Sequence, residues 1–423
     1  MRCERLTLAP ADDPARAAAG LRALIPAPES VRAAVSEIID AVRARGDDAV
    51  LEYTRRFDTA GAEPRAILVE RSALEAASAA LDEAARHGIA RAIENLEAVM
   101  VGSGPALARV VELAGNTVTL RQVPVARAAI YVPGGRAPYP STVVMGVVPA
   151  RLAGVEQIAV CAPPGRDGDI DPVILGACEM TGATTVYRMG GAHAIAALAY
   201  GTESVDPVDV IVGPGNLYVQ EAKRQVFGQA GIDGFAGPSD LMVIASADAD
   251  PEPLGFDLLA QAEHGSGTLV IAASDSSAII ERLGERLADG RETGAVAALV
   301  QTATIDQALA LAESFAPEHL QLAGAGAEAL AERVSRAGCL FVGANAGTAF
   351  GDYIAGSNHI LPTDGAARFA SGLGPEHFTR RFCEVRVADA GELARSAAPL
   401  ARAEGFEQHA RSMEARIREN GSA

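Results

Sequence analysis

The sequence predicts an α/β protein with two doubly wound domains, each built around a parallel sheet. Three observations support this fold class. Short apolar segments alternate with helical segments, and the apolar segments lack the alternating pattern of a strand with one solvated face. The alternation occurs in two separate series along the 423 residues, a length that allows more than one domain. We expect two parallel sheets covered by helices on both faces, with small helical extensions at both ends.

The first 130 residues are expected to be mostly helical. Val31, Val35 and Ile38 begin a run of apolar residues at helical spacing. We predict one helix over 31–57 and a second over 72–100, followed by a short strand near 118–121.

Two series of strands follow. The strands expected in the first series are 129–132, 158–161, 185–187 and 208–212, separated by helices over 141–154, 173–181, 191–200 and 217–227. The strands expected in the second series are 241–244, 269–271, 297–300, 319–322 and 340–342. After about 375 the chain becomes polar, and we predict a helical tail long enough to reach across a dimer.

These patterns suggest four parts of the chain. The expected boundaries are 1–29 for an N-terminal extension, 30–130 with 240–375 for a first α/β domain, 131–239 for a second α/β domain, and 376–423 for a C-terminal helical tail exchanged in a dimer. In open α/β sheets ligands gather at the carboxyl ends of the strands, so we expect the functional side chains there.

Composition excludes several classes of protein. A net charge of −18 is unfavourable for a nucleic-acid-binding protein, although the 36 basic residues are all Arg except Lys223. We expect no membrane span and no secretion signal, and therefore a cytoplasmic location. Five cysteines without a CxxC pattern indicate reduced thiols, with Cys161 and Cys178 in the core.

A metal site is suggested by Gln261 and His264, which share one face of a predicted helix. Zinc accepts imidazole nitrogen and, more rarely, an amide oxygen. Asp352 lies in the glycine-rich segment Gly351 to His359, where backbone and side chains can crowd a ligand. The same residues are compatible with an ordinary polar pair and a capped turn.

An acid/base pair is suggested by Glu318 and His319, because imidazole takes a proton near neutral pH and a carboxylate can activate water. A solvated pair in a loop is the structural alternative. The tripeptide recurs as Pro375-Glu376-His377, which does not precede an apolar strand, and its role is open.

Two glycine turns follow predicted strands, Pro133-Gly134-Gly135 and Gly213-Pro214-Gly215-Asn216. Main-chain N–H groups in such turns can bind phosphate at the start of a helix. The second turn is not a GxGxxG fingerprint, because Tyr218 occupies the third glycine position.

Taken in chain order, these and other spaced segments resemble the histidinol dehydrogenase family along nearly the whole sequence. The matching segments are Tyr131-Val132-Pro133-Gly134-Gly135, Gly190-Gly191-Ala192, Ile195 to Glu203, Ile211 to Asn216, Ala236-Gly237-Pro238-Ser239, Gln261 to His264, Pro317 to Leu320, Gly351-Asp352-Tyr353, Asn358-His359, Leu361-Pro362-Thr363, Glu404-Gly405 and His409.

The resemblance implies a cytoplasmic homodimer that oxidises L-histidinol to L-histidine through the aldehyde, with one Zn²⁺ per subunit and two NAD, at the end of histidine biosynthesis. The implied zinc ligands are Gln261, His264, Asp352 and, from the partner subunit, His409. His319 would be the general base, and Glu318 would activate water. The implied substrate contacts are these zinc ligands and His319, together with Ser239, His359 and Glu404, and the implied NAD contacts are Tyr131, His193 and Asn216.

Several positions depart from the family pattern: His193 stands in place of Gln, Asp240 in place of Glu and Gly265 in place of Asp. Glu94-Asn95-Leu96-Glu97 replaces an expected aromatic-His pair, and the segment Gly374 to His377 also departs. These changes leave open a paralogous zinc- and NAD-dependent dehydrogenase of another small polar alcohol, for example a sulfonated propanediol. A zinc hydrolase and a non-enzymatic nucleotide-binding module are further alternatives.

Overall fold

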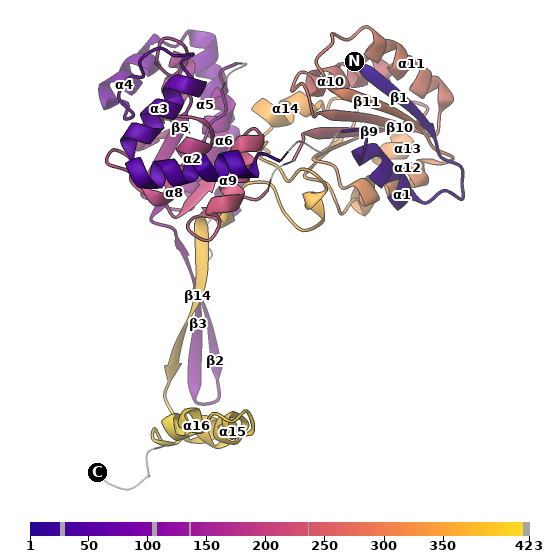
Figure 1. Ribbon diagram of the computed structural model, residues 1–423. Helices are drawn as coiled ribbons and strands as arrows, with labels where there is room; N and C mark the ends of the chain where they lie inside the picture. Colours follow the sequence, from indigo (N-terminus) through magenta and orange to yellow (C-terminus); the bar gives the residue numbers. More distant parts are fainter. Residues whose placement is uncertain (26–29, 104–107, 135–136, 236, 418–423) are drawn as a thin grey trace.

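The computed structural model describes residues 1–25, 30–103, 108–134, 137–235 and 237–417. Two parallel sheets form the centres of two α/β units, and a three-stranded antiparallel sheet extends from one unit as a stalk (Figure 1). The predicted pair of doubly wound parallel sheets is thereby confirmed. Gly135 of the first glycine turn, Ala236 and the end of the predicted tail, 418–423, lie outside the described residues.

The first unit contains a five-stranded sheet with the order β6-β5-β4-β7-β8 and only parallel pairs. Its strands are β4 (Arg127–Tyr131), β5 (Gln157–Ala162), β6 (Thr185–Arg188), β7 (Val210–Val212) and β8 (Gly231–Ile232). Consecutive residues of β4 enter opposite cores: Ala128 and Ile130 pack on one face, Ala129 and Tyr131 on the other. This double burial explains why the strand is apolar at every position.

Helices cover both faces of this sheet. One face packs against α4 (Arg71–Ala80), α5 (Glu83–Met100), α6 (Pro140–Leu152) and α7 (Pro172–Thr181). The other packs against α2 (Arg32–Arg45), α3 (Asp47–Phe57), α8 (Gly191–Tyr200) and α9 (Leu217–Val226). A short 3₁₀ turn, Val101–Ser103, follows α5.

The second unit contains a six-stranded parallel sheet with the order β1-β11-β10-β9-β12-β13. Its strands are β1 (Arg2–Thr7), β9 (Asp240–Ala245), β10 (Leu269–Ser274), β11 (Val296–Gln301), β12 (His319–Ala323) and β13 (Cys339–Val342). One face packs against α1 (Pro14–Arg22), α12 (Ile305–Phe315) and α13 (Ala325–Glu328). The other packs against α10 (Pro251–Ala262) and α11 (Ser277–Ala288). The short elements that follow are Ala331–Arg333, α14 (Thr348–Tyr353), Ala366–Arg368 and Pro375–Phe378.

Both long helices predicted near the N-terminus are interrupted, so those two predictions were wrong in extent. The first breaks between α2 and α3 at Gly46, where φ is +54° and a Cβ would lie 2.1 Å from Glu203 Oε2. The second breaks after Leu81, and Asp82 Oδ1 accepts a hydrogen bond from Ala85 N at 2.8 Å, which starts α5. Helical spacing of apolar residues continues across such breaks and therefore does not reveal them.

Two of the expected boundaries are also corrected. Residues 1–29 are not an extension, because β1 forms the edge of the six-stranded sheet beside β11. The helices of 30–103 pack on the five-stranded sheet and not on the sheet formed by 240–342. Periodicity identifies the apolar face of a helix, but it does not identify the sheet that this face covers.

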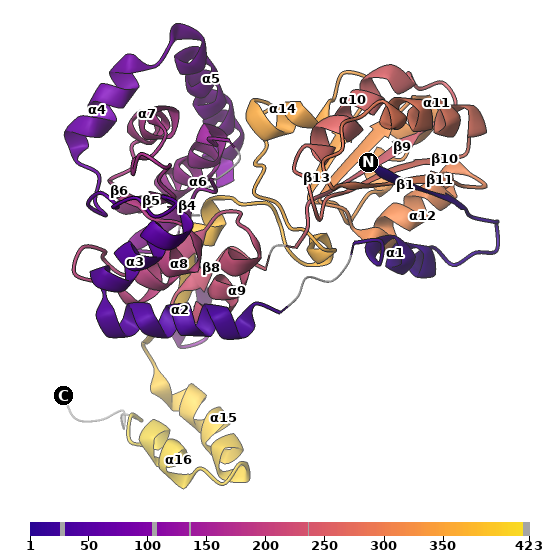
Figure 2. The ribbon, with the colours of Figure 1, turned by 45° about the horizontal axis from the view of Figure 1, so that its top comes forward.

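The stalk consists of β2 (Arg109–Leu113), β3 (Asn116–Pro124) and β14 (Thr379–Val387), with the helix pair α15 (Ala390–Ala403) and α16 (Glu407–Glu414) at its far end (Figures 1 and 2). The expectation of a wholly helical tail was therefore wrong, because all nine residues of β14 pair with β3. None of the described helices has the length and apolarity that a membrane span requires.

Candidate active site

Most of the predicted catalytic and metal-binding residues converge at the amino-terminal edge of the six-stranded sheet. His319 is the first residue of β12, and Ser239 directly precedes β9. Helix α10 follows β9 and runs back along the sheet, so its last turn carries Gln261 to the same edge and the turn after it carries His264. The prediction that both residues lie on one helix was wrong for His264, because α10 ends at Ala262. The expectation that these side chains lie at the carboxyl ends of the strands was therefore wrong for this unit.

Ser239 is the centre of a hydrogen-bonded chain. Its Oγ accepts a hydrogen bond from Gln261 Nε2 at 2.7 Å and donates one to Glu318 Oε2 at 2.5 Å. Gln261 and Glu318 are both buried. Three residues from distant parts of the sequence are thus held in one network, with defined side-chain orientations.

Asp240 adds a second carboxyl group beside Glu318, a contact that sequence reasoning missed. Asp240 N donates to Glu318 Oε2 at 3.0 Å, and Glu318 N donates to Asp240 Oδ1 at 2.8 Å. Burial, together with the neighbouring Glu318 carboxylate, raises the pKa of Asp240 to about 7. Burial also raises the pKa of Glu318, against the opposing effect of the His319 charge. The substitution of Asp for the family's Glu at 240 was visible in the sequence, but this contact was not.

His319 lies between two carboxylates. Its Nε2 is 3.6 Å from Asp352 Oδ1, and its Nδ1 is 3.8 Å from Glu318 Oε2. Burial lowers the pKa of the imidazole, but the charges of Glu318 and Asp352 outweigh this effect and raise the pKa to about 9. The pKa of Asp352 is lowered, because its interaction with His319 exceeds the effect of burial. The ring of His319 also faces Phe341, with ring centroids 5.9 Å apart.

Two further histidines border this group. His264 is exposed, and its Nδ1 lies 3.0 Å from the carbonyl oxygen of Gln261. His359 Nδ1 lies 2.8 Å from the carbonyl oxygen of Asp352, and its Nε2 lies 3.3 Å from Thr142 Oγ1 of α6. Burial lowers the pKa of His359. Because α6 belongs to the five-stranded unit, His359 is located where the two units meet.

Glu404 and His409 are not brought to this site within one chain. Glu404 ends α15 and His409 belongs to α16, and both helices lie at the far end of the stalk, away from the six-stranded sheet (Figure 1). Within the described ranges, no group of three His, Cys, Asp or Glu side chains is arranged to hold a metal ion. This follows from the predicted set itself, since Gln261 is an amide and His409 is distant, so only His264 and Asp352 remain together.

The glycine turns lie at the carboxyl edge of the five-stranded sheet, as expected. Tyr131, the last residue of β4, contacts both the start of α8 and the second glycine turn: its hydroxyl accepts a hydrogen bond from Gly191 N at 3.1 Å, and its carbonyl oxygen would lie 2.2 Å from a Cβ placed on Gly213. Asn216 Oδ1 caps α9 by accepting hydrogen bonds from Tyr218 N and Val219 N at 3.0 and 3.2 Å. The start of α8 and the turn that precedes α9 therefore both contact Tyr131.

His193 of α8, another of the predicted cofactor contacts, is buried. Its Nε2 lies 3.3 Å from Thr54 Oγ1 and 3.4 Å from Asp58 Oδ2, and its ring is 5.9 Å from that of Tyr53. Its contacts are thus made with α3 and with the residue that follows it. The imidazole lies close to Gly191, since its Nδ1 would be 3.4 Å from a Cβ placed on that residue.

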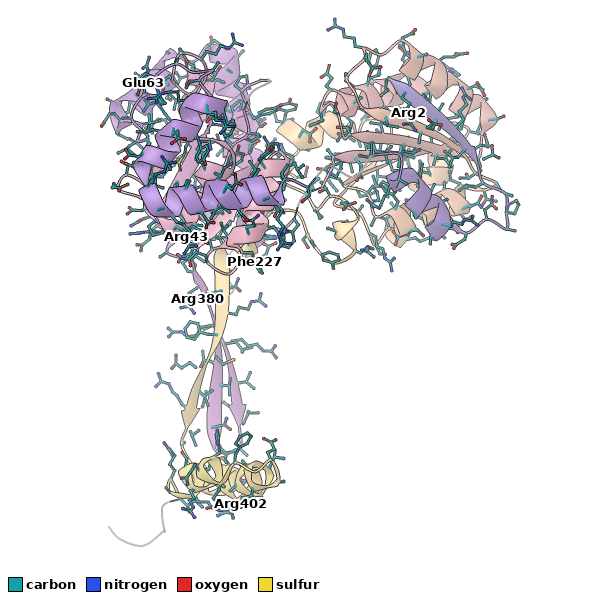
Figure 3. The ribbon with its side chains drawn as sticks, viewed as in Figure 1. Arg2, Arg43, Glu63, Phe227, Arg380 and Arg402 are labelled. Carbon is teal, nitrogen blue, oxygen red and sulfur yellow. The ribbon has the colours of Figure 1, made fainter. Side chains whose placement is uncertain are left out.

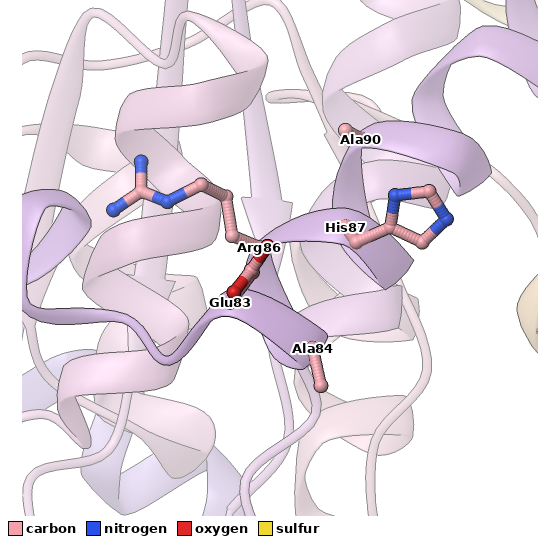
Figure 4. A pocket seen from close by; sticks show the side chains of 5 residues that line it. All are labelled: Glu83, Ala84, Arg86, His87 and Ala90. Carbon is pink, nitrogen blue, oxygen red and sulfur yellow. The ribbon is translucent and has the colours of Figure 1, made fainter.

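Two other features lie outside this arrangement. The second Pro-Glu-His motif, residues 375–377, forms a local helix cap, since His377 Nδ1 accepts a hydrogen bond from Gly374 N at 3.1 Å. A pocket over the first turns of α5 is lined by side chains of that helix alone: Glu83, Ala84, Arg86, His87 and Ala90 (Figure 4). None of the predicted site residues lines this pocket.

Together, a histidine held by carboxylates on one unit and glycine turns on the other define a two-unit α/β enzyme. The family model for histidinol dehydrogenase matches residues 26–417. Histidinol dehydrogenase of Parasynechococcus marenigrum is 44% identical over 405 residues, covering 92% of both chains, and that of Pseudomonas aeruginosa is 41% identical over 403 residues, covering 92% of this chain and 91% of the relative. The crystal structure of histidinol dehydrogenase from Elizabethkingia anophelis superposes with a TM-score of 0.89 at 30% identity, covering 98% and 97% of the two chains. The chain therefore belongs to the histidinol dehydrogenase family and is an oxidoreductase.

Proposed function

We propose that this protein oxidises L-histidinol to L-histidine through the aldehyde, using two NAD and one Zn²⁺ per subunit. The single observation that carries the proposal is the position of His319 between Glu318 and Asp352, beside Gln261 and His264, in a chain of this family. Relatives with 40–44% identity bear the name histidinol dehydrogenase, which supports histidinol as the substrate.

The donor set fits a zinc ion. Gln261 at the end of α10 offers an amide oxygen, and His264 in the turn after α10 offers an imidazole nitrogen. Asp352 of α14 offers a carboxylate oxygen, and His409 of a second copy would complete the set. Bound there, zinc would fix the orientation of a ligand's nitrogen and oxygen atoms. The exposed His264 and the partly exposed Asp352 are the members of the set that a ligand from outside can reach.

His319 would take the proton of the alcohol as hydride leaves for NAD. A general base works best with a pKa near the operating pH. A cation on Asp352 would withdraw that carboxylate from His319 and would lower the pKa of the imidazole from about 9 toward neutrality.

Glu318 would activate the water that adds to the aldehyde before the second hydride transfer. Its hydrogen bond from Ser239 orients the carboxylate, and Ser239 and His359 would contact the substrate at the border of the two units. Glu404 of a second copy would accept a hydrogen bond from the substrate's imidazole N–H. A carboxylate at this place also disfavours a sulfonated substrate.

The surface of the stalk supports the inference that two copies of the chain associate. Figure 3 labels Arg380 near the start of the stalk and Arg402 in the helix pair at its far end. Its exposed large apolar residues are Val110, Leu113, Leu120, Phe382, Val385, Val387, Leu400 and Phe406. Apolar side chains gathered on an exposed three-stranded sheet are typical of a surface that binds another protein, because binding removes them from water. We propose a homodimer in which the stalk of one copy delivers Glu404 and His409 to the six-stranded unit of the other.

NAD would bind at the carboxyl edge of the five-stranded sheet. The pyrophosphate would lie at the amino-terminal ends of α8 and α9, and the side-chain N–H₂ of Asn216 would donate to the cofactor while its oxygen caps α9. His193, buried behind Gly191, would contribute by shaping this turn.

The test is NADH formation from L-histidinol by metal-depleted and zinc-restored protein. We expect turnover only with zinc and two NADH for each histidine formed. A folded protein that binds zinc and NAD but leaves L-histidinol unchanged would contradict the proposal.

A further inference from the structure

The chain contains 36 basic side chains, of which Lys223 is the only lysine. Among the residues that the structure describes, it is one of the largest fully buried side chains, with a relative exposure of 1%. Burial of an ammonium group is costly unless it is paired and hydrogen-bonded. Because arginine serves at every other basic position, a lysine in the interior indicates a local requirement for a compact cation with a flexible stem.

The partners of Lys223 show what this requirement is. Lys223 extends from α9 and forms an ion pair with Asp233, the residue directly after β8, whose side chain is 11% exposed. Lys223 Nζ also donates to Gly213 O at 3.0 Å, and Gly213 N donates to Asp233 Oδ2 at 2.7 Å. The pair therefore holds both polar main-chain atoms of Gly213.

Gly213 begins the turn that ends at Asn216 and starts α9. Its φ is +119°, and a Cβ placed on it would lie 2.2 Å from Tyr131 O, so the turn has no room for a side chain at this position. Hydrogen bonds from the buried pair thus fix Gly213, which has no side chain of its own to hold its place in the turn.

We propose that Lys223 and Asp233 are positioning residues for NAD binding. By fixing Gly213, they set the path of the turn to Asn216 and the direction of the first N–H groups of α9. This inference rests on the proposed function, because it assumes that NAD binds at this edge of the sheet.

The test compares Lys223→Met, the double variant Lys223→Met/Asp233→Asn, and Arg71→Met. The double variant leaves no unpaired buried carboxylate and is expected to recover the melting temperature lost in the single variant. Arg71→Met is the matched control, because it breaks a 2.7 Å ion pair with Glu179 in the same unit, away from the glycine turns.

In both Lys223 variants, we expect the Kd for NAD, measured by calorimetry, to rise about tenfold, which corresponds to about 1.4 kcal/mol. The KM for NAD of the Lys223 variants should rise in parallel, while their KM for histidinol should stay within about twofold, since the proposed substrate site lies on the other unit. The affinity of Arg71→Met for NAD should also stay within about twofold, since Arg71 lies away from the glycine turns. Unchanged NAD affinity in a folded double variant would overturn the inference alone. Absence of NAD binding by the unaltered protein would overturn the proposed function as well.

A second measurement needs no variant. Acylation of Lys223 by an amine-reactive reagent requires opening of the turn, so NAD should slow it, with the Met1 amine of the other unit as the internal reference. Equal acylation rates with and without saturating NAD would overturn the inference even if the Lys223 variants fail to fold.

Discussion

His319 Nε2 lies 3.6 Å from Asp352 Oδ1, so the first residue of β12 contacts a carboxylate carried by α14. This contact joins a proposed general base to a proposed zinc ligand. It also explains why the two roles depend on one another: Asp352 sets the charge that His319 experiences, and any cation bound by Asp352 changes it.

Replacing His319 by Asn tests its role as the base. Asn is of similar size and polarity but does not accept a proton near neutral pH, so kcat should fall by about 10² to 10⁴-fold. Zinc content should be unchanged, because His319 is outside the proposed ligand set. His87→Asn on the exposed surface of α5 is the control and should behave as the unaltered protein. Full activity of His319→Asn would remove the residue from the mechanism.

Gly213→Ala tests the close approach of the second glycine turn to Tyr131. The new Cβ would lie 2.2 Å from a carbonyl oxygen, in addition to the strain of a positive φ, so stability should fall by several kcal/mol. Gly182→Ala is the matched control, because its φ is +84° and no atom lies within 4 Å, which leaves a strain of about 1 to 2 kcal/mol alone. Equal melting temperatures for the two variants would show that the turn yields to the added methyl group.

The cysteines provide a test of the core. Burial raises the pKa of the Cys161 and Cys178 thiols well above the usual range, whereas Cys383 is exposed on the stalk. A thiol reagent at pH 8 should modify Cys383 in the native protein and reach Cys161 and Cys178 only after unfolding, since the thiolate is the reactive form. Mass spectrometry of the peptides measures this order, and early modification of Cys178 would show that α7 opens in the native state.

Much of the architecture was predictable from local patterns. Apolar strands without alternation, such as 129–132, identified parallel sheets buried on both faces. The pairing of β1 with β11 was not predictable, because the partners lie far apart in sequence and β1 carries charged residues. Strand β14 was not predictable either. Its apolar residues Phe382 and Val385 are exposed, so the strand has no apolar face buried in a core that would reveal it in the sequence.

Part of the residue set that converges at the candidate site was predictable from the sequence, but its geometry was not. Spacing predicted Gln261 and His264 on one helix, but α10 ends at Ala262 and His264 lies in the turn that follows. The family resemblance supplied the proposed roles. Two features depended on the fold: the site is at the amino-terminal edge of the sheet, and Ser239 bridges Gln261 and Glu318. Contacts of this kind come from segments distant in sequence, and local periodicity carries no information about them.

A site shared between two copies is the central claim, and mixed dimers test it most directly. Chains with His264→Ala and chains with His409→Ala should each be inactive toward L-histidinol with zinc and NAD. After co-refolding of differently tagged chains, a heterodimer would contain one intact site out of two, so a statistical mixture should recover about one quarter of the activity. No recovered NADH formation in a purified heterodimer would contradict a site completed by the partner's stalk.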